Sequence, residues 1–192
     1  NAVFEYLLRQ SGGQCEVTSV ARALGIARQT VESHLRALEI THAVAVIRPF
    51  HGGGQGELVR QSKVYGFDTG FVSYARGWDP LRPEDLGSLW EHLVLEQLQA
   101  RFPDIAIRYW RDRQGHEVDF VLAGRRDEVD AIECQWNPDA FDAAGLRAFR
   151  SHHPHGRNFL VTPSGDPAYM KAFGSLQVRV CTPGETASPQ SQ

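Results

Sequence analysis

Four residues have the types and the spacing to bind a divalent cation. Asp119 and Glu133 each interrupt an apolar stretch, and Gln135 follows Glu133 by two residues, while Glu91 lies on an apolar side of a predicted helix. A carboxylate inside an apolar strand is costly unless its charge is compensated, and Mg²⁺ or Mn²⁺, which prefer oxygen ligands, would provide that compensation. The alternative is that each acid lies on a solvated sheet face.

Two short strands are predicted to carry these acids. Residues 116–122 and 129–136 alternate apolar and polar side chains, with Asp119 on one face of the first strand and Glu133 on one face of the second. The polar link 123–127 is short enough to make them an antiparallel hairpin. We therefore expect Glu91, Asp119, Glu133 and Gln135 to converge on one cleft.

The elements around this hairpin are those of a mixed α and β domain. Amphipathic periodicity and β-rich runs predict a helix at 84–101, a strand at 105–110, a helix at 139–150, and strands at 158–162 and 176–181. The predicted order is αβββαβ around a central mixed sheet, so the fold class is α+β or α/β.

The first half of the chain predicts a winged helix-turn-helix. Apolar periodicity gives helices at 1–10, 16–24 and 28–39, followed by β-rich runs at 43–50 and 57–65 on either side of a glycine-rich tip at 51–56. No Lys-Ser or Lys-Thr follows those glycines and a strand comes next, so they form neither a P-loop nor another nucleotide site. The predicted domains are 1–76 (winged helix) and 77–182, with a disordered tail at 183–192.

The third predicted helix exposes side chains that can read DNA. These are Arg28, Gln29, Thr30, Ser33, His34 and Arg36. Arg, Gln and Thr near the start of a helix can reach base edges in a major groove. Residues 1–76 carry 8 Lys and Arg against 6 Asp and Glu, so any DNA contact must be local. Winged helices also serve as protein-docking modules, which is the alternative.

Composition excludes several other classes of protein. The net charge is −3 and the hydrophobic content is 42%, which is ordinary for a globular chain with a core. There is no run of about 18 apolar residues, so we expect no membrane association. Cys15, Cys134 and Cys181 form no CxxC pair, which fits a reducing cytoplasm and excludes a zinc site. The histidines at 152–155 are typical of a solvated loop rather than a metal site. A start at Asn1 rather than Met suggests a piece of a longer protein.

Both halves together resemble a known family. The resemblance rests on the segments GIARQTVESHLRALE, KVYGFDTGF, LGSLWEHLVLEQL, YWRDRQGHEVDFVL and AIECQ, and covers most of residues 1–162. They are similar to the C-terminal region of a large bacterial and archaeal family of AAA-type ATPases, where a winged helix precedes a domain resembling PD-(D/E)XK nucleases. The resemblance implies a restriction-endonuclease-like fold, an ATPase module in the full-length protein, DNA as partner, and a metal site at Asp119, Glu133 and Glu91.

One position departs from the nuclease pattern. Where that motif has lysine, this chain has Gln135, which can orient a water molecule but brings no charge and cannot transfer a proton. The chain has two lysines, Lys63 and Lys171, and neither motif places one nearby. Arg111 or His116 could substitute, although arginine is a poor proton acceptor.

Three functions remain open. The first is metal-dependent phosphodiester hydrolysis, with Asp119, Glu133, Gln135 and Glu91 as catalytic residues. The second is an inactive nuclease-fold module that targets or regulates an attached ATPase. The third is a transcriptional regulator built on the winged helix, which leaves the acids unexplained.

Overall fold

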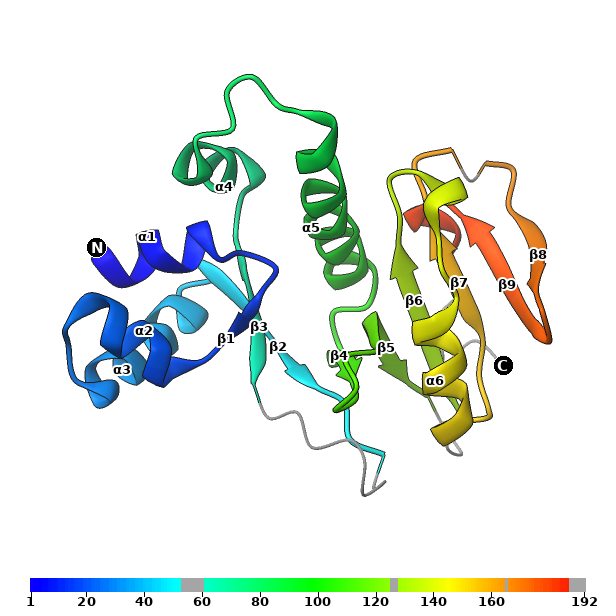
Figure 1. Ribbon diagram of the computed structural model, residues 1–192, viewed down its shortest axis with the longest axis horizontal. Helices are drawn as coiled ribbons and strands as arrows, with labels where there is room; N and C mark the ends of the chain where they lie inside the picture. Colours follow the sequence, from blue (N-terminus) through cyan, green and yellow to red (C-terminus); the bar gives the residue numbers. More distant parts are fainter. Residues whose placement is uncertain (53–60, 125–127, 165, 187–192) are drawn as a thin grey trace. The chain divides into compact units, whose positions relative to one another are not determined.

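A computed structural model describes residues 1–52, 61–124, 128–164 and 166–186 (Figure 1). The chain divides into two compact units. The first contains residues 1–48 and the stretch from the second strand of the hairpin to His92, and the second contains everything from Leu93 on together with a short segment that begins at Pro49. The predicted limits at 76 and 182 differ from this division and stay predictions. The tip of the wing at 53–60 lies outside the described residues.

The first unit has the element order of a winged helix. Its elements are α1 (Ala2–Arg9), β1 (Gln14–Cys15), α2 (Val17–Leu24), α3 (Arg28–Ile40), β2 (Val44–Pro49), β3 (Ser62–Gly66) and α4 (Thr69–Arg76). The strands form an antiparallel sheet in the order β1-β3-β2. Gly25 ends α2 in the left-handed conformation that glycine adopts without strain, which allows the tight turn into α3.

Two apolar clusters hold this unit together. Val3 and Leu7 of α1 pack with Val44 and Val64 of the hairpin, and Val31 of α3 packs against α2. Helix α4 was not predicted. Its first turn is capped by the Asp68 side chain, which accepts hydrogen bonds from the two amides that open the helix.

The second unit is a mixed sheet with helices packed on it. Its elements are the C-terminal part of α5 (Pro83–Arg101), β4 (Ile107–Arg111), β5 (Glu117–Ala123), β6 (Val129–Cys134), a 3-10 turn η1 (Pro138–Ala140), α6 (Ala144–His152), β7 (Asn158–Val161), β8 (Tyr169–Phe173), β9 (Leu176–Cys181) and a 3-10 turn η2 (Pro183–Glu185). The strand order is β4-β5-β6-β7-β9-β8. Strands β6, β7 and β9 run parallel, and the other neighbours are antiparallel.

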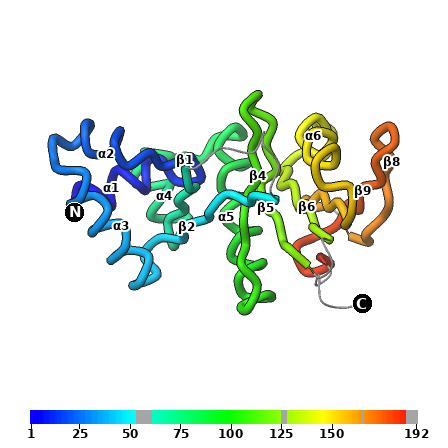
Figure 2. Tube along the Cα trace, turned by 90° about the horizontal axis from the view of Figure 1, so that it is seen from below, coloured from blue at the N-terminus to red at the C-terminus, as the bar shows by residue number. Residues whose placement is uncertain are grey.

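Helix α6 covers one face of this sheet. Leu146 and Phe149 of α6 belong to the same buried cluster as Val121, Ala131 and Leu160 on three successive strands. Figures 1 and 2 show α6 lying along that face. The helix is shorter than predicted, because the polar stretch before it forms η1 and a loop instead.

The predicted αβββαβ order and the antiparallel hairpin are confirmed, so the protein is α+β. Strand β8 was missed, because its pattern of burial is mostly exposed. The predicted tail starts with an ordered turn, since Glu185 caps η2 by accepting from the amide and hydroxyl of Thr182. Residues 187–192 and 125–127 lie outside the described part. Of the described helices, none has both the length and the apolar character needed to cross a bilayer.

Candidate functional site: an acidic pair beside a β-bulge

Asp119 lies in a bulge of β5. Arg108 pairs with Val121 and Trp110 with Val118, so two residues of β5, Asp119 and Phe120, face a single residue of β4. The strict alternation predicted for residues 116–122 is therefore wrong, and Val118 shares a buried cluster with Val121 instead of facing away from it. Bulges redirect side chains and are frequent beside active sites.

The Asp119 carboxylate takes the place of a backbone acceptor. Along β6 the amides of Ala131 and Gln135 donate to carbonyl oxygens next to β7, so the intervening amide of Cys134 faces β5. That amide donates to Asp119 Oδ2 over 2.8 Å. The register between β5 and β6 ends at Phe120 and Ile132, which makes Asp119 and Glu133 the next facing positions. The bulge thus places a carboxylate where the two strands part.

Glu133 lies on the face covered by α6. Its neighbour in the parallel register is Leu160, which packs against α6, and Glu133 is only 8% exposed. A Cβ added at Gly145, in the first turn of α6, would lie 3.3 Å from Glu133 Oε1. The same Cβ would lie 2.1 Å from the carbonyl oxygen of Glu117, so only glycine fits there. The helix N-terminus carries a partial positive charge and stabilises the Glu133 carboxylate.

Gln135 follows β6 directly. Its backbone amide donates to Val161 O over 3.0 Å, and its side chain is half-buried. Alternation from Glu133 directs the Gln135 amide to the same side of the sheet. The second unit therefore places Asp119, Glu133 and Gln135 near the point where β5 and β6 part, and the convergence of their side chains on one site stays a prediction.

This donor set fits a hard cation that keeps part of its hydration shell. Mg²⁺ is commonly bound through one or two carboxylates, with water or phosphate completing six ligands. Among the residues that the structure describes, no three His, Cys, Asp or Glu side chains gather closely enough to hold a metal on their own. Asp119 and Glu133 could hold such an ion only together with water or substrate oxygens.

Glu91, the fourth predicted site residue, belongs to the first unit and has close partners there. Tyr65 donates its hydroxyl to Glu91 Oε1 over 2.5 Å, and Lys63 Nζ lies 3.1 Å from the same oxygen. The side chain of Lys63 is only 5% exposed. The sequence motifs did not indicate that Lys63 lies beside Glu91. Periodicity along the sequence could not show this contact, because it joins β3 to α5 and depends on how the two elements pack.

A second buried polar pair in the first unit was also missed. His92 Nε2 and Ser11 Oγ are 2.7 Å apart, and Ser11 Oγ accepts from the amide of Gly66. Burial lowers the pKa of His92, although its hydrogen bond to Ser88 O and the nearby charge of Glu91 oppose this shift.

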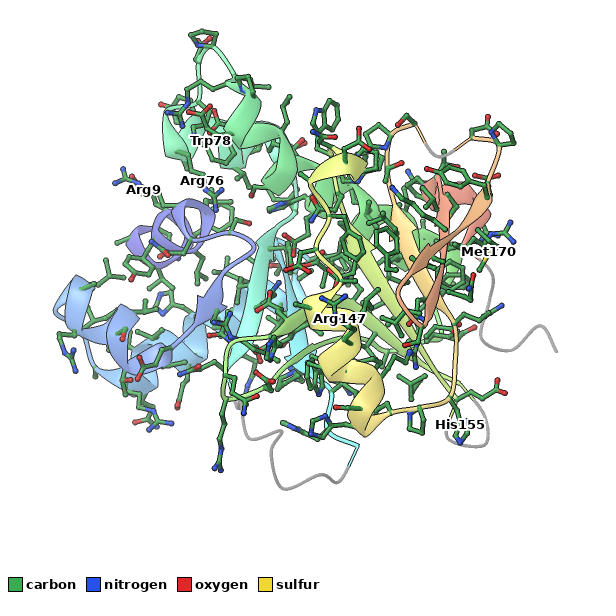
Figure 3. The ribbon with its side chains drawn as sticks, turned by 45° about the vertical axis from the view of Figure 1, so that its right-hand side comes forward. Arg9, Arg76, Trp78, Arg147, His155 and Met170 are labelled. Atoms are coloured by element: carbon green, nitrogen blue, oxygen red, sulfur yellow. The ribbon has the colours of Figure 1, made fainter. Side chains whose placement is uncertain are left out.

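Arg76 of α4 contacts the residues around Ser11 and Ser88. It donates to the carbonyl oxygens of Arg9 and Ser11 and to Ser88 Oγ, and its guanidinium lies 4.6 Å from the ring centre of Trp78 (Figure 3). An arginine whose donors bind backbone oxygens serves packing rather than ligand binding. We assign these contacts to structure.

The predicted DNA-reading face of α3 is exposed. Arg28, Gln29, Thr30, Ser33 and Arg36 are exposed and His34 is half-buried. Arg28 is paired with Glu32 over 2.8 Å, and His34 Nδ1 bonds to Thr30 O, so two of the six side chains already have partners on their own helix. Arg36 is the strongest remaining candidate for a phosphate contact.

The other candidates for chemistry have structural partners. His153 packs between the rings of Phe50 and Phe149. Arg111 forms an ion pair with Glu117 over 2.7 Å. His116 Nδ1 lies 2.7 Å from Asp112 Oδ2. Burial raises the pKa of Asp112, but bonds from the ring and backbone of His116 outweigh it and leave that pKa lowered.

Comparison with known proteins gives names without activities. A domain of unknown function (DUF8612) matches residues 1–82, and another (DUF4143) matches residues 86–177. Two uncharacterised mycobacterial proteins, Rv2008c of Mycobacterium tuberculosis and Mb2031c of Mycobacterium bovis, are each 34% identical over 112 residues, which is 55% of this chain. The match spans only 25% of the length of these relatives. No solved structure matches the chain.

Proposed function

We propose that this chain is a DNA-associated module with a nuclease-like divalent-metal site that hydrolyses phosphodiesters slowly or not at all. The observation that carries the proposal is the placement of Asp119 in a β-bulge opposite Glu133, with Gln135 two residues further on. Carboxylates on adjacent, parting strands are what the PD-(D/E)XK resemblance implies.

The chemistry follows from the three side chains. A bound Mg²⁺ or Mn²⁺ would supply charge stabilisation and a more acidic bound water. Asp119 and Glu133 would hold the ion, and the buried position of Glu133 would keep its carboxylate oriented. Gln135 can hydrogen-bond a water molecule but supplies no positive charge beside a phosphate.

The first unit supplies the proposed DNA contact. The side chains of Gln29, Thr30 and Arg36 are exposed on α3, the helix that enters the major groove in helix-turn-helix proteins. Because the relatives extend well beyond the matched region, we also propose that the module works beside an ATPase module of a longer protein. In such a protein, the module would direct the ATPase to DNA.

A catalytically inactive regulatory module is the second candidate. The observation that favours it is that Glu91, one of the three predicted metal ligands, already interacts with Lys63 and Tyr65. On this view the nuclease-like fold is kept for docking, and neither metal nor DNA cleavage is involved.

Calorimetric titration with Mn²⁺ tests the proposal. Asp119→Asn is the sharpest variant, because an amide oxygen can still accept from the Cys134 amide while the charge is lost. We expect one site per chain in the native protein and at least a tenfold loss of affinity in Asp119→Asn. Glu128→Ala removes an exposed acid near the same hairpin and should bind as the native chain does. Absence of Mn²⁺ binding, or equal binding by both variants, would refute the metal site.

A further inference from the structure

A cationic cavity lies on the second unit, at the end of the sheet opposite the acidic pair. It has a volume of about 520 Å³, within the range of small-molecule sites. It opens where the parallel strands β7 and β9 begin, whereas Glu133 and Gln135 lie where β6 ends. Three arginines line it, Arg150, Arg157 and Arg179, and none of its lining residues in the described chain is acidic.

The three arginines differ in how their charge is balanced. Arg157 forms an ion pair with the buried Asp130 over 2.6 Å. Within the described residues, Arg150 donates to neutral oxygens, namely Asn158 Oδ1 and the carbonyl oxygens of three residues in the loop after α6. Burial lowers the pKa of Arg150 to about 10, although the charge of Asp130 opposes the shift. Arg179 is exposed and forms no hydrogen bond or ion pair within the described residues.

The cavity also has an apolar wall. Met170 of β8 faces Arg179 of β9 in the antiparallel register, and Phe159 of β7 faces Arg179 on its other side. These three side chains therefore lie in a row on one face of the sheet. Met170, labelled in Figure 3, belongs to the edge strand β8 and is 59% exposed, and Leu176 adds a second apolar side chain to the cavity lining.

The opposite wall is a tight loop between α6 and β7. Gly156 has a φ of +119°, and a Cβ there would lie 2.1 Å from Val129 O, so this position requires glycine. Arg150 fixes the same loop through its bonds to carbonyl oxygens. A wall fixed in this way is preformed, which reduces the entropic cost of binding a ligand.

We propose that this cavity binds a small organic anion with an apolar body. Arg179 would receive the acidic group, the charge of Arg150 would add to the field around it, and the apolar body would lie against Met170 and Leu176. A carboxylate and a phosphate ester share this chemistry. The inference is independent of the metal site, because no residue is common to the two.

Fluorescence titration with 8-anilinonaphthalene-1-sulfonate, an anion with an aromatic body, tests the cavity. Arg179→Ala should weaken binding about tenfold or more, because a charge-assisted hydrogen bond is lost. Arg113→Ala removes the same charge from an exposed turn of the same unit and should change nothing. Competition with octanoate or with AMP would then show whether a carboxylate or a phosphate is preferred.

A second pair of variants distinguishes binding in the cavity from non-specific binding to the protein surface. Met170→Glu places a carboxylate beside Arg179 and should also weaken binding about tenfold, whereas Tyr169→Glu places it on the opposite face and should not. Both positions are exposed, so neither change should prevent folding. Binding that is equal in Arg179→Ala and Arg113→Ala, or equal in the two glutamate variants, would overturn the proposal.

Discussion

The two units compensate their semi-buried acids in different ways. In the first, Glu91 is bound by two side chains, the ammonium of Lys63 and the hydroxyl of Tyr65. In the second, Asp119 lies in a β-bulge and accepts a hydrogen bond from the backbone amide of Cys134, and Glu133 lies beside the first turn of α6. One acid is neutralised by a fixed cation of the protein, and the other two are stabilised by peptide dipoles.

The difference shows why acid spacing alone does not define a metal site. A carboxylate next to a buried ammonium gains little from a further cation, because its charge is already balanced. A peptide dipole carries only a partial charge, so it balances less of a carboxylate's charge than an ammonium group does. Breaking either arrangement should therefore have distinct consequences.

The largest expected effect concerns the charge missing from the second unit. Gln135→Lys would place an ammonium beside the acidic pair, and a preorganised charge of this kind is typically worth about 10²–10³ in rate. We expect any Mn²⁺-dependent cleavage of DNA to rise by that factor, measured on single-stranded, duplex and branched substrates. Gln135→Met is the matched control and should not raise the rate. Rapid cleavage by the native chain would contradict the assignment of Gln135 as the limiting residue.

The next effect concerns the charge pair of the first unit. Glu91→Gln keeps an oxygen for Tyr65 but leaves the buried Lys63 without its carboxylate. Breaking such a pair should lower the free energy of unfolding by about 3 kcal/mol, measured by urea denaturation. Adding Lys63→Met should recover part of that loss, and strictly additive effects of the two changes would mean that the pair is not coupled.

A smaller effect is expected from pH. Burial lowers the pKa of His92 below the ordinary value near 6.5 that it has in the unfolded chain. The unfolded state then binds more protons, and the first unit should lose stability as pH falls below about 6.5, by at most about 1.4 kcal/mol per pH unit. Thermal unfolding of His92→Gln should show a weaker pH dependence than the native protein. An equal pH dependence of the variant and the native protein would contradict this role of His92.

The smallest effect concerns the DNA-reading helix. If Arg36 contacts a phosphate, Arg36→Ala should reduce the slope of log affinity against log salt by about 0.9 on any duplex sequence. Anisotropy titrations at several salt concentrations measure this slope. Arg113→Ala, in the other unit, is the control for net charge. Binding that ignores salt in the native chain would favour the protein-docking alternative.

Several features of the fold could be predicted because they depend on local patterns. Helices α1, α2, α3 and α5 follow from apolar periodicity, and Gly25 marks the end of α2. The hairpin of β5 and β6 follows from alternating apolar and polar residues around a short polar link, and it places Asp119 and Glu133 on neighbouring strands. Strand β8 could not be found in this way, since an exposed edge strand has no apolar stripe.

The sequence by itself thus determined the element order, the α+β class and the pairing of two acids on neighbouring strands, because period and turn length are local properties of the chain. Only the tertiary structure decided that Asp119 sits in a bulge, since a bulge depends on the register with β4. It alone also decided that Glu91 is paired with Lys63, and that arginines from α6, from the loop before β7 and from β9 line one cavity. These contacts join residues far apart in the chain, and the packing of whole elements, rather than any local spacing, brings them together.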